Sequence, residues 1–412
     1  MLADVPIVFV LVGLAAYAVL AGADFGAGFW TLFSGGGRAG RRATREHAHH
    51  AMGPVWEANH VWLIFVFVVC WTAYPVAISS ITSTLSIPLL IAAVGIILRG
   101  TAYALRGQLE GAPGERAVER VFALSSIITP FALGTVIGGI ASGRVPVGNA
   151  KGDLVTSWLN PTAILIGALF VVFSAYLAAV YLAADARRLG EHALELDFRM
   201  RALATGIVAG ALALAGLLVV REDARSLWHG LTTAAGLAMI GVSAAAGVLT
   251  LGLVFRCRFG PARASAALAV AAIIAGWAAG QEPRLLPGLT IEQAAAGRSS
   301  LVAIVIAVAA GSIVLIPALA LLFGLFLRGR LGPAEPAPAP AGRPVTDAPP
   351  RRGLTAFAVL TLVTGTALMV LLDSGWAHVV GVLCLFAGAV AAFALAAPLA
   401  DEPISRYRQP GS

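Results

Sequence analysis

Apolar segments long enough to cross a lipid bilayer recur from one end of this 412-residue chain to the other. A transmembrane α-helix needs about 20 consecutive apolar residues. Only 12% of the residues are charged, whereas soluble domains carry roughly 25%. Because backbone groups in lipid must pair internally, uninterrupted apolar runs of this length fold as helices. The sequence therefore predicts an all-α polytopic membrane protein, with a nine-helix transmembrane bundle and a C-terminal transmembrane helical hairpin. The predicted bundle helices are 5–33, 55–78, 81–105, 119–142, 160–184, 201–220, 229–255, 264–280 and 300–327, and the hairpin helices are 354–372 and 377–399.

Basic residues set the predicted orientation, because loops rich in Arg and Lys stay on the cytoplasmic side. The loops after odd-numbered helices, together with Arg120 and Arg201 at the start of the helices that follow, carry 19 basic residues, and the loops after even-numbered helices up to the eighth carry 6. The odd-numbered loops are therefore predicted to be cytoplasmic, and the N-terminus periplasmic. Contact with anionic membrane lipids accounts for the net charge of +7, so no nucleic-acid partner is expected.

A segment rich in proline and alanine, 331–350, marks the clearest boundary in the chain. Its prolines cannot donate helix hydrogen bonds, so it should form an extended spacer. We predict a transmembrane domain at 1–330, a linker at 331–352 and a two-helix extension at 353–412. The three cysteines are isolated in the sequence, so neither a disulfide nor a cysteine metal site is expected. They are Cys70, Cys257 and Cys384.

Polar residues interrupt the first three predicted helices: Asp24 in the first, Glu57, Asn59 and His60 in the second, and Arg99 in the third. With an outward N-terminus and a rise of about 1.5 Å per residue, all lie within roughly 15 Å of the cytoplasmic boundary. Charges at such depth are expensive and usually serve ion or proton paths. In the alternative interpretation, the same charges form a buried network whose only role is to hold the three helices together. Spacing alone leaves both interpretations open.

The first helix is rich in glycine around its acid, and the Gly22-x-x-x-Gly26 spacing, with Gly28 beyond it, allows a neighbouring helix to approach closely. Asp24 needs a partner or a water-filled cavity at that depth. We therefore predict that Asp24 and Glu57 face each other or share such a cavity.

Two of the polar residues have competing interpretations. Arg99 either extends to the lipid headgroups or pairs with one of the acids, and we predict the pairing. His60 is a hydrogen-bonding member of the network, a proton relay, or an axial ligand to an extra haem. We favour the network or relay, with His60 bonded to Glu57 or a nearby polar group, because no other intramembrane His lies in the first three helices.

The segment GPVWEANHVWL resembles the GPVWDGNEVWL signature of subunit II of the cytochrome bd-type quinol oxidases. YAVLAGADFGAGFW is similar to that family's first helix, and AAVGIILRGTAYALRGQ to its third, which contains Arg-Gly. With QEPRLLPGLTIEQAAA, the resemblance spans about 1–328. The matching motif residues are Gly53, Pro54, Trp56, Asn59, Trp62 and Gly100.

The resemblance implies a heterodimer in a bacterial inner membrane, in which subunit I carries the haems, the quinol site and the oxygen-reducing centre. Subunit II would support it and contribute a proton path through Asp24, Glu57, His60 and Arg99. No haem or metal bound directly to this chain is expected, and whether a structural quinone or lipid fills a cavity in it stays open.

The sequence also departs from the family pattern. Ala21 and Ala104 stand where acids are usual, and His60 replaces an expected Glu. The hairpin lies outside the resemblance, and its position suggests a fused equivalent of a small accessory subunit. Two other classes of function remain: a secondary transporter with discontinuous helices, and a purely structural membrane scaffold.

Overall fold

The computed structural model describes residues 2–33, 40, 43–48, 56–106, 115–327, 352–371 and 375–396. At Trp56, Glu57 and Ala58 only the backbone is described. Gly53, Pro54 and the linker 331–351 lie outside the described residues. The chain divides into two compact units, Met1–Ala320 and Leu321–Ser412.

The first unit is a bundle of long helices, eight of which are long and apolar enough to cross a membrane among the described residues. This confirms the predicted all-α membrane fold. The elements are η1 Leu2–Asp4, α1 Val5–Leu32, α3 Trp56–Ala73, α4 Pro75–Thr84, α5 Ser86–Arg106, α6 Glu115–Ala141, α7 Pro161–Leu189, α8 His192–Asp223, α9 Arg225–Leu231, α10 Ala234–Phe255, α11 Phe259–Gln281, β1 Arg284–Leu286, β2 Leu289–Thr290, α12 Ile291–Ala294 and α13 Arg298–Leu327.

Several predicted helix boundaries were wrong, because local chemistry breaks or extends the apolar runs. Pro75 has no N–H to continue α3, so the predicted helix 55–78 divides into α3 and α4 at Tyr74. Thr233 caps α10 by accepting a hydrogen bond from the Gly236 N–H, which divides the predicted helix 229–255.

The turn between α7 and α8 is shorter than predicted. Gly190 adopts a left-handed conformation (φ 75°) that ends α7, and α8 begins directly afterwards at His192. The predicted helix 201–220 therefore starts nine residues too late. The antiparallel β1–β2 hairpin was not predicted.

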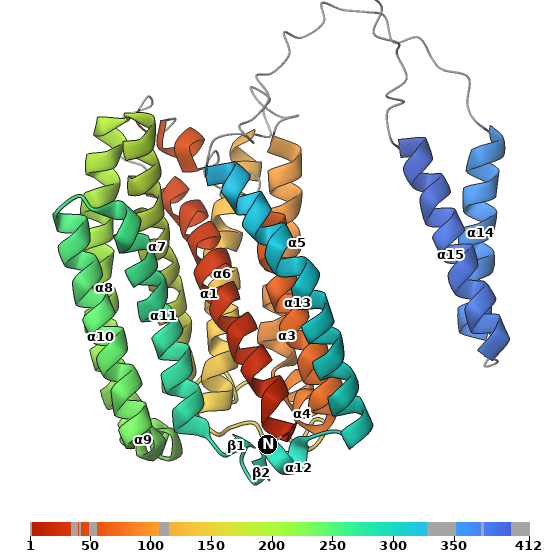
Figure 1. Ribbon diagram of the computed structural model, residues 1–412, viewed down its shortest axis with the longest axis horizontal. Helices are drawn as coiled ribbons and strands as arrows, with labels where there is room; N and C mark the ends of the chain where they lie inside the picture. The colour runs from red at the N-terminus through yellow and green to blue at the C-terminus, as the bar shows by residue number, and fades with distance from the viewer. Residues whose placement is uncertain are drawn as a thin grey trace, which may run out of the picture. The chain divides into compact units, whose positions relative to one another are not determined.

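Helix α1 lies in the middle of the first unit and packs against α3, α6, α7 and α11 (Figure 1). Gly26 permits the closest of these approaches, because a Cβ there would lie 1.8 Å from the Ser174 carbonyl oxygen of α7. One turn later, the Trp30 indole N–H donates to the Ala175 carbonyl at 2.9 Å. The central position of α1 brings Asp24 into the protein interior, where it is 5% exposed.

The second unit contains a helical hairpin of α14 Arg352–Leu371 and α15 Gly375–Ala396. Gly365 allows the two helices to touch, since a Cβ there would lie 2.9 Å from the Gly381 carbonyl oxygen. Phe357, Leu383 and Phe386 are among its exposed apolar side chains. That these faces cover the bundle or a partner stays a prediction.

Candidate functional site

A buried ion pair between Arg99 of α5 and Asp24 of α1 forms the centre of the candidate site. The guanidinium Nη1 lies 2.5 Å from Asp24 Oδ2, and Nη2 donates to Asp24 Oδ1 at 3.0 Å and to the Asp24 carbonyl at 2.9 Å. The side chains are only 3% and 5% exposed. Such a two-pronged pair is strong and fixes geometry as well as charge. The prediction that Arg99 pairs with an acid is confirmed.

Helix α6 completes the surroundings of Arg99. The Arg99 Nε–H donates to Ser126 Oγ at 3.0 Å, and the Ser126 hydroxyl donates to the Phe122 carbonyl at 2.7 Å. The guanidinium carbon also lies 5.0 Å from the ring centroid of Phe25 and 4.8 Å from that of Phe122. Contact with aromatic faces stabilises a desolvated cation. The charge of Arg99 is thus held by three helices.

Glycine at position 28 makes room for this arrangement. A Cβ on Gly28 would lie 2.1 Å from Ser126 Oγ, whereas one on Gly22 would first meet Leu177 Cδ1 at an ordinary 3.4 Å. The predicted packing role of the glycines is therefore strong at Gly26 and Gly28 and weak at Gly22. Gly100 follows Arg99 within α5 and is half-buried.

The polar residues of α3 lie beside the ion pair. The His60 ring centroid is 6.2 Å from that of Tyr17 and 6.1 Å from that of Phe25, the residue that also contacts Arg99. The Asn59 amide donates to the Leu20 carbonyl at 3.3 Å. Trp62, from the same motif, packs against the Tyr17–Phe25 cluster. The structure therefore brings residues from the first three predicted helices together.

Three buried oxygens near this group form no hydrogen bond with the described residues: Tyr17 Oη, Asn59 Oδ1 and Thr129 Oγ1. Buried polar groups are normally bonded to protein or to ordered water. Thr129 lies in α6 one turn from Ser126, against Gly95 of α5. The helix contacts around the ion pair therefore contain further buried polar groups beside the pair itself.

Other predicted features have mixed outcomes. The side chain of Glu57 lies outside the described residues, and so does the predicted approach of Asp24 to Glu57. Ala21, where the family usually has an acid, is completely buried, whereas Ala104 is exposed. The three cysteines are free.

Ser126 and Phe122 were not predicted as members of the site. The signal in the sequence was the serine pair in VFALSSIITP, and serines in membrane helices commonly bond to their own backbone, so the pair did not indicate a site.

A second ion pair, also not predicted, lies at the end of the bundle where η1 and α9 are found. Arg144 Nη2 lies 2.6 Å from Asp223 Oδ1, and the Thr162 hydroxyl donates to Asp223 Oδ2 at 2.6 Å. Hydrogen bonding to Asp223 raises the pKa of Arg144 above its usual range. These contacts connect the end of α6 to the end of α8 and to the start of α7.

We expect Asp223→Ala to lower the stability of the bundle by about 1 kcal/mol, since the pair is partly solvated and hydrogen bonds to charged groups contribute modestly there. The unfolding midpoint of the purified protein, followed by tryptophan fluorescence, measures this. Glu222→Ala is the matched control, because the neighbouring Glu222 side chain is 76% exposed. Equal midpoints for the two variants would show that the Arg144–Asp223 ion pair does not stabilise the bundle.

The fold and the buried charges define a multi-pass helical membrane protein with a polar group inside the bundle. Residues 2–326 match the family described as cytochrome bd terminal oxidase subunit II, and the chain belongs to this family. The resemblance inferred from the motifs is thus confirmed, and the chain is a multi-pass protein of the bacterial inner membrane.

Two relatives are similar to this chain. Cytochrome bd ubiquinol oxidase subunit 2 of Bacillus subtilis (strain 168) is 30% identical over 133 residues, which are 32% of this chain and 38% of that protein. The match thus spans well under half of that relative. A solved structure of bd oxidase from Geobacillus thermodenitrificans has 26% identity and a TM-score of 0.67, and the match covers 79% of this chain and 98% of that one. The α14–α15 hairpin lies beyond the family match.

Proposed function

We propose that this chain acts as subunit II of a cytochrome bd-type quinol:oxygen oxidoreductase. It would support a haem-bearing subunit I, where quinol is oxidised and oxygen is reduced to water, and would contribute a path for protons from the cytoplasm. The haems, the quinol site and the oxygen-reducing centre belong to the partner in this proposal. Membership of the subunit II family supports the assignment. The observation that carries the proton path is the buried Arg99–Asp24 pair, with nearby buried oxygens that form no hydrogen bond with the described residues.

The residues divide into two roles. Both carboxylate oxygens of Asp24 accept hydrogen bonds from Arg99, so carrying a proton would require Asp24 to break this pairing. We therefore assign Asp24 and Arg99 a positioning role, in which they hold two opposite charges at a fixed place inside the bundle. Proton transfer is assigned to Glu57 and His60. Imidazole exchanges protons near neutral pH, which suits a relay. Water bonded to Tyr17, Asn59 and Thr129 would link these groups.

Two rival functions are less well supported. A secondary transporter conflicts with membership of the oxidase family. A purely structural scaffold would contain the same ion pair. Replacing one member of a buried pair destabilises the packing of the helices whether or not protons move, so a loss of stability fits both functions. Activity measured on fully assembled complexes distinguishes a proton path from a scaffold.

We expect Glu57→Gln to lower quinol-driven oxygen uptake about tenfold or more in the assembled complex, because a positioned proton-transfer group typically contributes at least that much. The measurement is oxygen consumption per haem in purified complex, after the amount of subunit I has been matched. Glu292→Gln, at an exposed position in α12, is the control and should be neutral. Unchanged turnover in Glu57→Gln would favour the scaffold function.

A further inference from the structure

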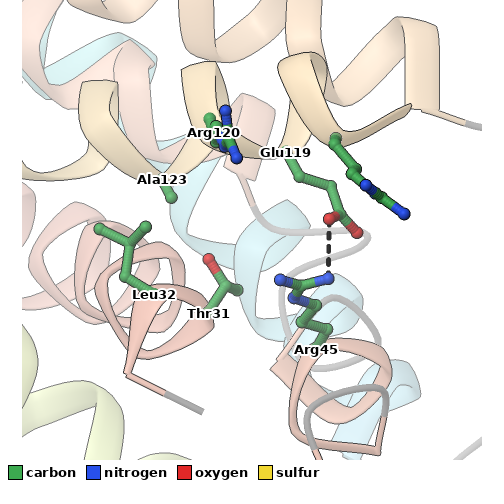
Figure 2. A pocket seen from close by; sticks show the side chains of 7 residues that line it. Thr31, Leu32, Arg45, Glu119, Arg120 and Ala123 are labelled. Atoms are coloured by element: carbon green, nitrogen blue, oxygen red, sulfur yellow. Dashed lines mark hydrogen bonds and ion pairs between the residues drawn. The ribbon is translucent and has the colours of Figure 1, made fainter. Parts of the chain in front are cut away.

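A cavity of about 190 Å³ lies between the end of α1, residue Arg45 and the first turns of α6. Figure 2 shows Arg120 and Ala123 above Thr31 and Leu32, with Glu119 and its partner Arg45 to the right. Arg116 also lines it. This cavity is separate from the Arg99–Asp24 pair and has no part in the proposed proton path.

The charges around the cavity are strongly unbalanced. Glu119 is already paired, since Arg45 Nη1 lies 2.7 Å from its Oε2. Arg116 and Arg120 are exposed and form no ion pair with the part of the chain that the structure describes. Three guanidinium groups therefore face one carboxylate. Guanidinium forks match the geometry of phosphate oxygens, which they bind by two parallel hydrogen bonds.

Arg116 and Arg120, which have no ion-pair partner among the described residues, also repel each other, and Arg116 interacts unfavourably with its own helix. Arg116 and Arg120 are four residues apart, so their like charges lie on one face of α6. Arg116 also lies in the first turn of α6, where the helix dipole favours negative groups. A bound anion would offset the repulsion between the two arginines and the unfavourable interaction of Arg116 with the helix dipole.

The position of the cavity indicates where the anion comes from. One apolar span ends at Leu32 and another begins at Arg116, so the cavity lies at the level where the helices leave the membrane. Leu32 is 40% exposed and the adjacent Phe33 57% exposed, which provides an apolar surface beside the charges. The cavity has several times the roughly 30 Å³ that one liquid water occupies. A phosphate group with part of its glycerol would therefore fit.

We propose that this cavity binds the phosphodiester headgroup of an anionic phospholipid, with Arg116 and Arg120 as ligands and Arg45 held beside them by Glu119. The acyl chains would lie along Leu32 and Phe33. Basic pockets between membrane helices recognise lipid headgroups in this way. The proposal does not depend on the oxidase function.

The test is a lipid titration of the complete purified complex, followed by native mass spectrometry. Phosphatidylglycerol and phosphatidylcholine are added separately to wild type, to Arg116→Gln/Arg120→Gln, and to Arg256→Gln/Arg258→Gln. The last variant removes two exposed arginines from the turn between α10 and α11, so it is matched in charge. We expect wild type and the matched control to retain phosphatidylglycerol selectively. The pocket variant should bind it roughly 30-fold more weakly, from two charges near the surface.

Two further arms keep the test decisive. Arg116→Lys/Arg120→Lys retains the charge without the planar fork and should bind at an intermediate level. Inorganic phosphate at millimolar concentration should not displace the lipid, and full displacement would mean that the site takes free phosphate instead. Equal losses in the pocket variant and the matched control, or no preference for phosphatidylglycerol in wild type, would overturn the proposal.

Discussion

Replacing Arg99 with leucine is expected to lower the yield of assembled complex to a small fraction of the wild-type yield. The substitution leaves the Asp24 carboxylate buried without its cation and removes the hydrogen bond to Ser126. Removing one partner of a buried pair typically costs about 3–5 kcal/mol. Both side chains are almost completely buried, so solvent gives little relief. The yield of complex after mild detergent extraction, measured by the haem spectrum, reports the effect.

Two companion variants show why assembly is lost. Arg99→Lys keeps the charge but not the two-pronged geometry, so its yield should be intermediate. Asp24→Leu/Arg99→Leu removes both charges, and replacing a whole buried pair with apolar residues is often nearly neutral. This double variant should assemble better than Arg99→Leu. Normal assembly of Arg99→Leu by itself would indicate that the pair contributes little.

The double variant also separates the two functions left open by the sequence. If the pair fixes charge for a proton path, the assembled double variant should consume oxygen more slowly than wild type. If the charges only hold helices together, its turnover per haem should be normal. Assembly and turnover therefore have to be measured on the same preparations.

That Arg99 pairs with a buried acid could be predicted from sequence because it depends on depth along the helices, whereas the choice of Asp24 over Glu57 comes from the structure. Counting residues from the predicted membrane boundary places Asp24 and Arg99 at the same level, and the cost of leaving either charge alone in lipid favours their pairing. The overall helical fold was predictable for a similar reason, since bilayer thickness fixes the length of the apolar runs.

The remaining contacts could not be predicted because they depend on how neighbouring helices are rotated about their axes. Ser126 and Phe122 reach Arg99 only because α6 turns that face toward α5. Arg144 and Asp223 are 79 residues apart in the chain, and nothing in their local sequence links them. The break at Tyr74 depends on backbone geometry, and a proline within an apolar run predicts it only weakly.

Gly26→Ala is expected to have the second-largest effect, because a backbone atom occupies the space that its methyl group would need. The new Cβ would lie 1.8 Å from the Ser174 carbonyl oxygen, so α1 and α7 would have to move apart. That movement would weaken the nearby hydrogen bond from Trp30 to Ala175. Overpacking of this kind costs about 1–3 kcal/mol or more.

Gly22→Ala is the matched control in the same helix. A Cβ at Gly22 would meet its nearest neighbour, Leu177 Cδ1, at 3.4 Å, which is ordinary contact. Both substitutions gain the same helix propensity, worth up to about 1 kcal/mol, so the difference between them isolates the packing of α1 against α7. We expect Gly22→Ala to keep the unfolding midpoint of the purified complex and Gly26→Ala to lower it by several degrees. Equal midpoints would show that α1 and α7 are not in such close contact at Gly26.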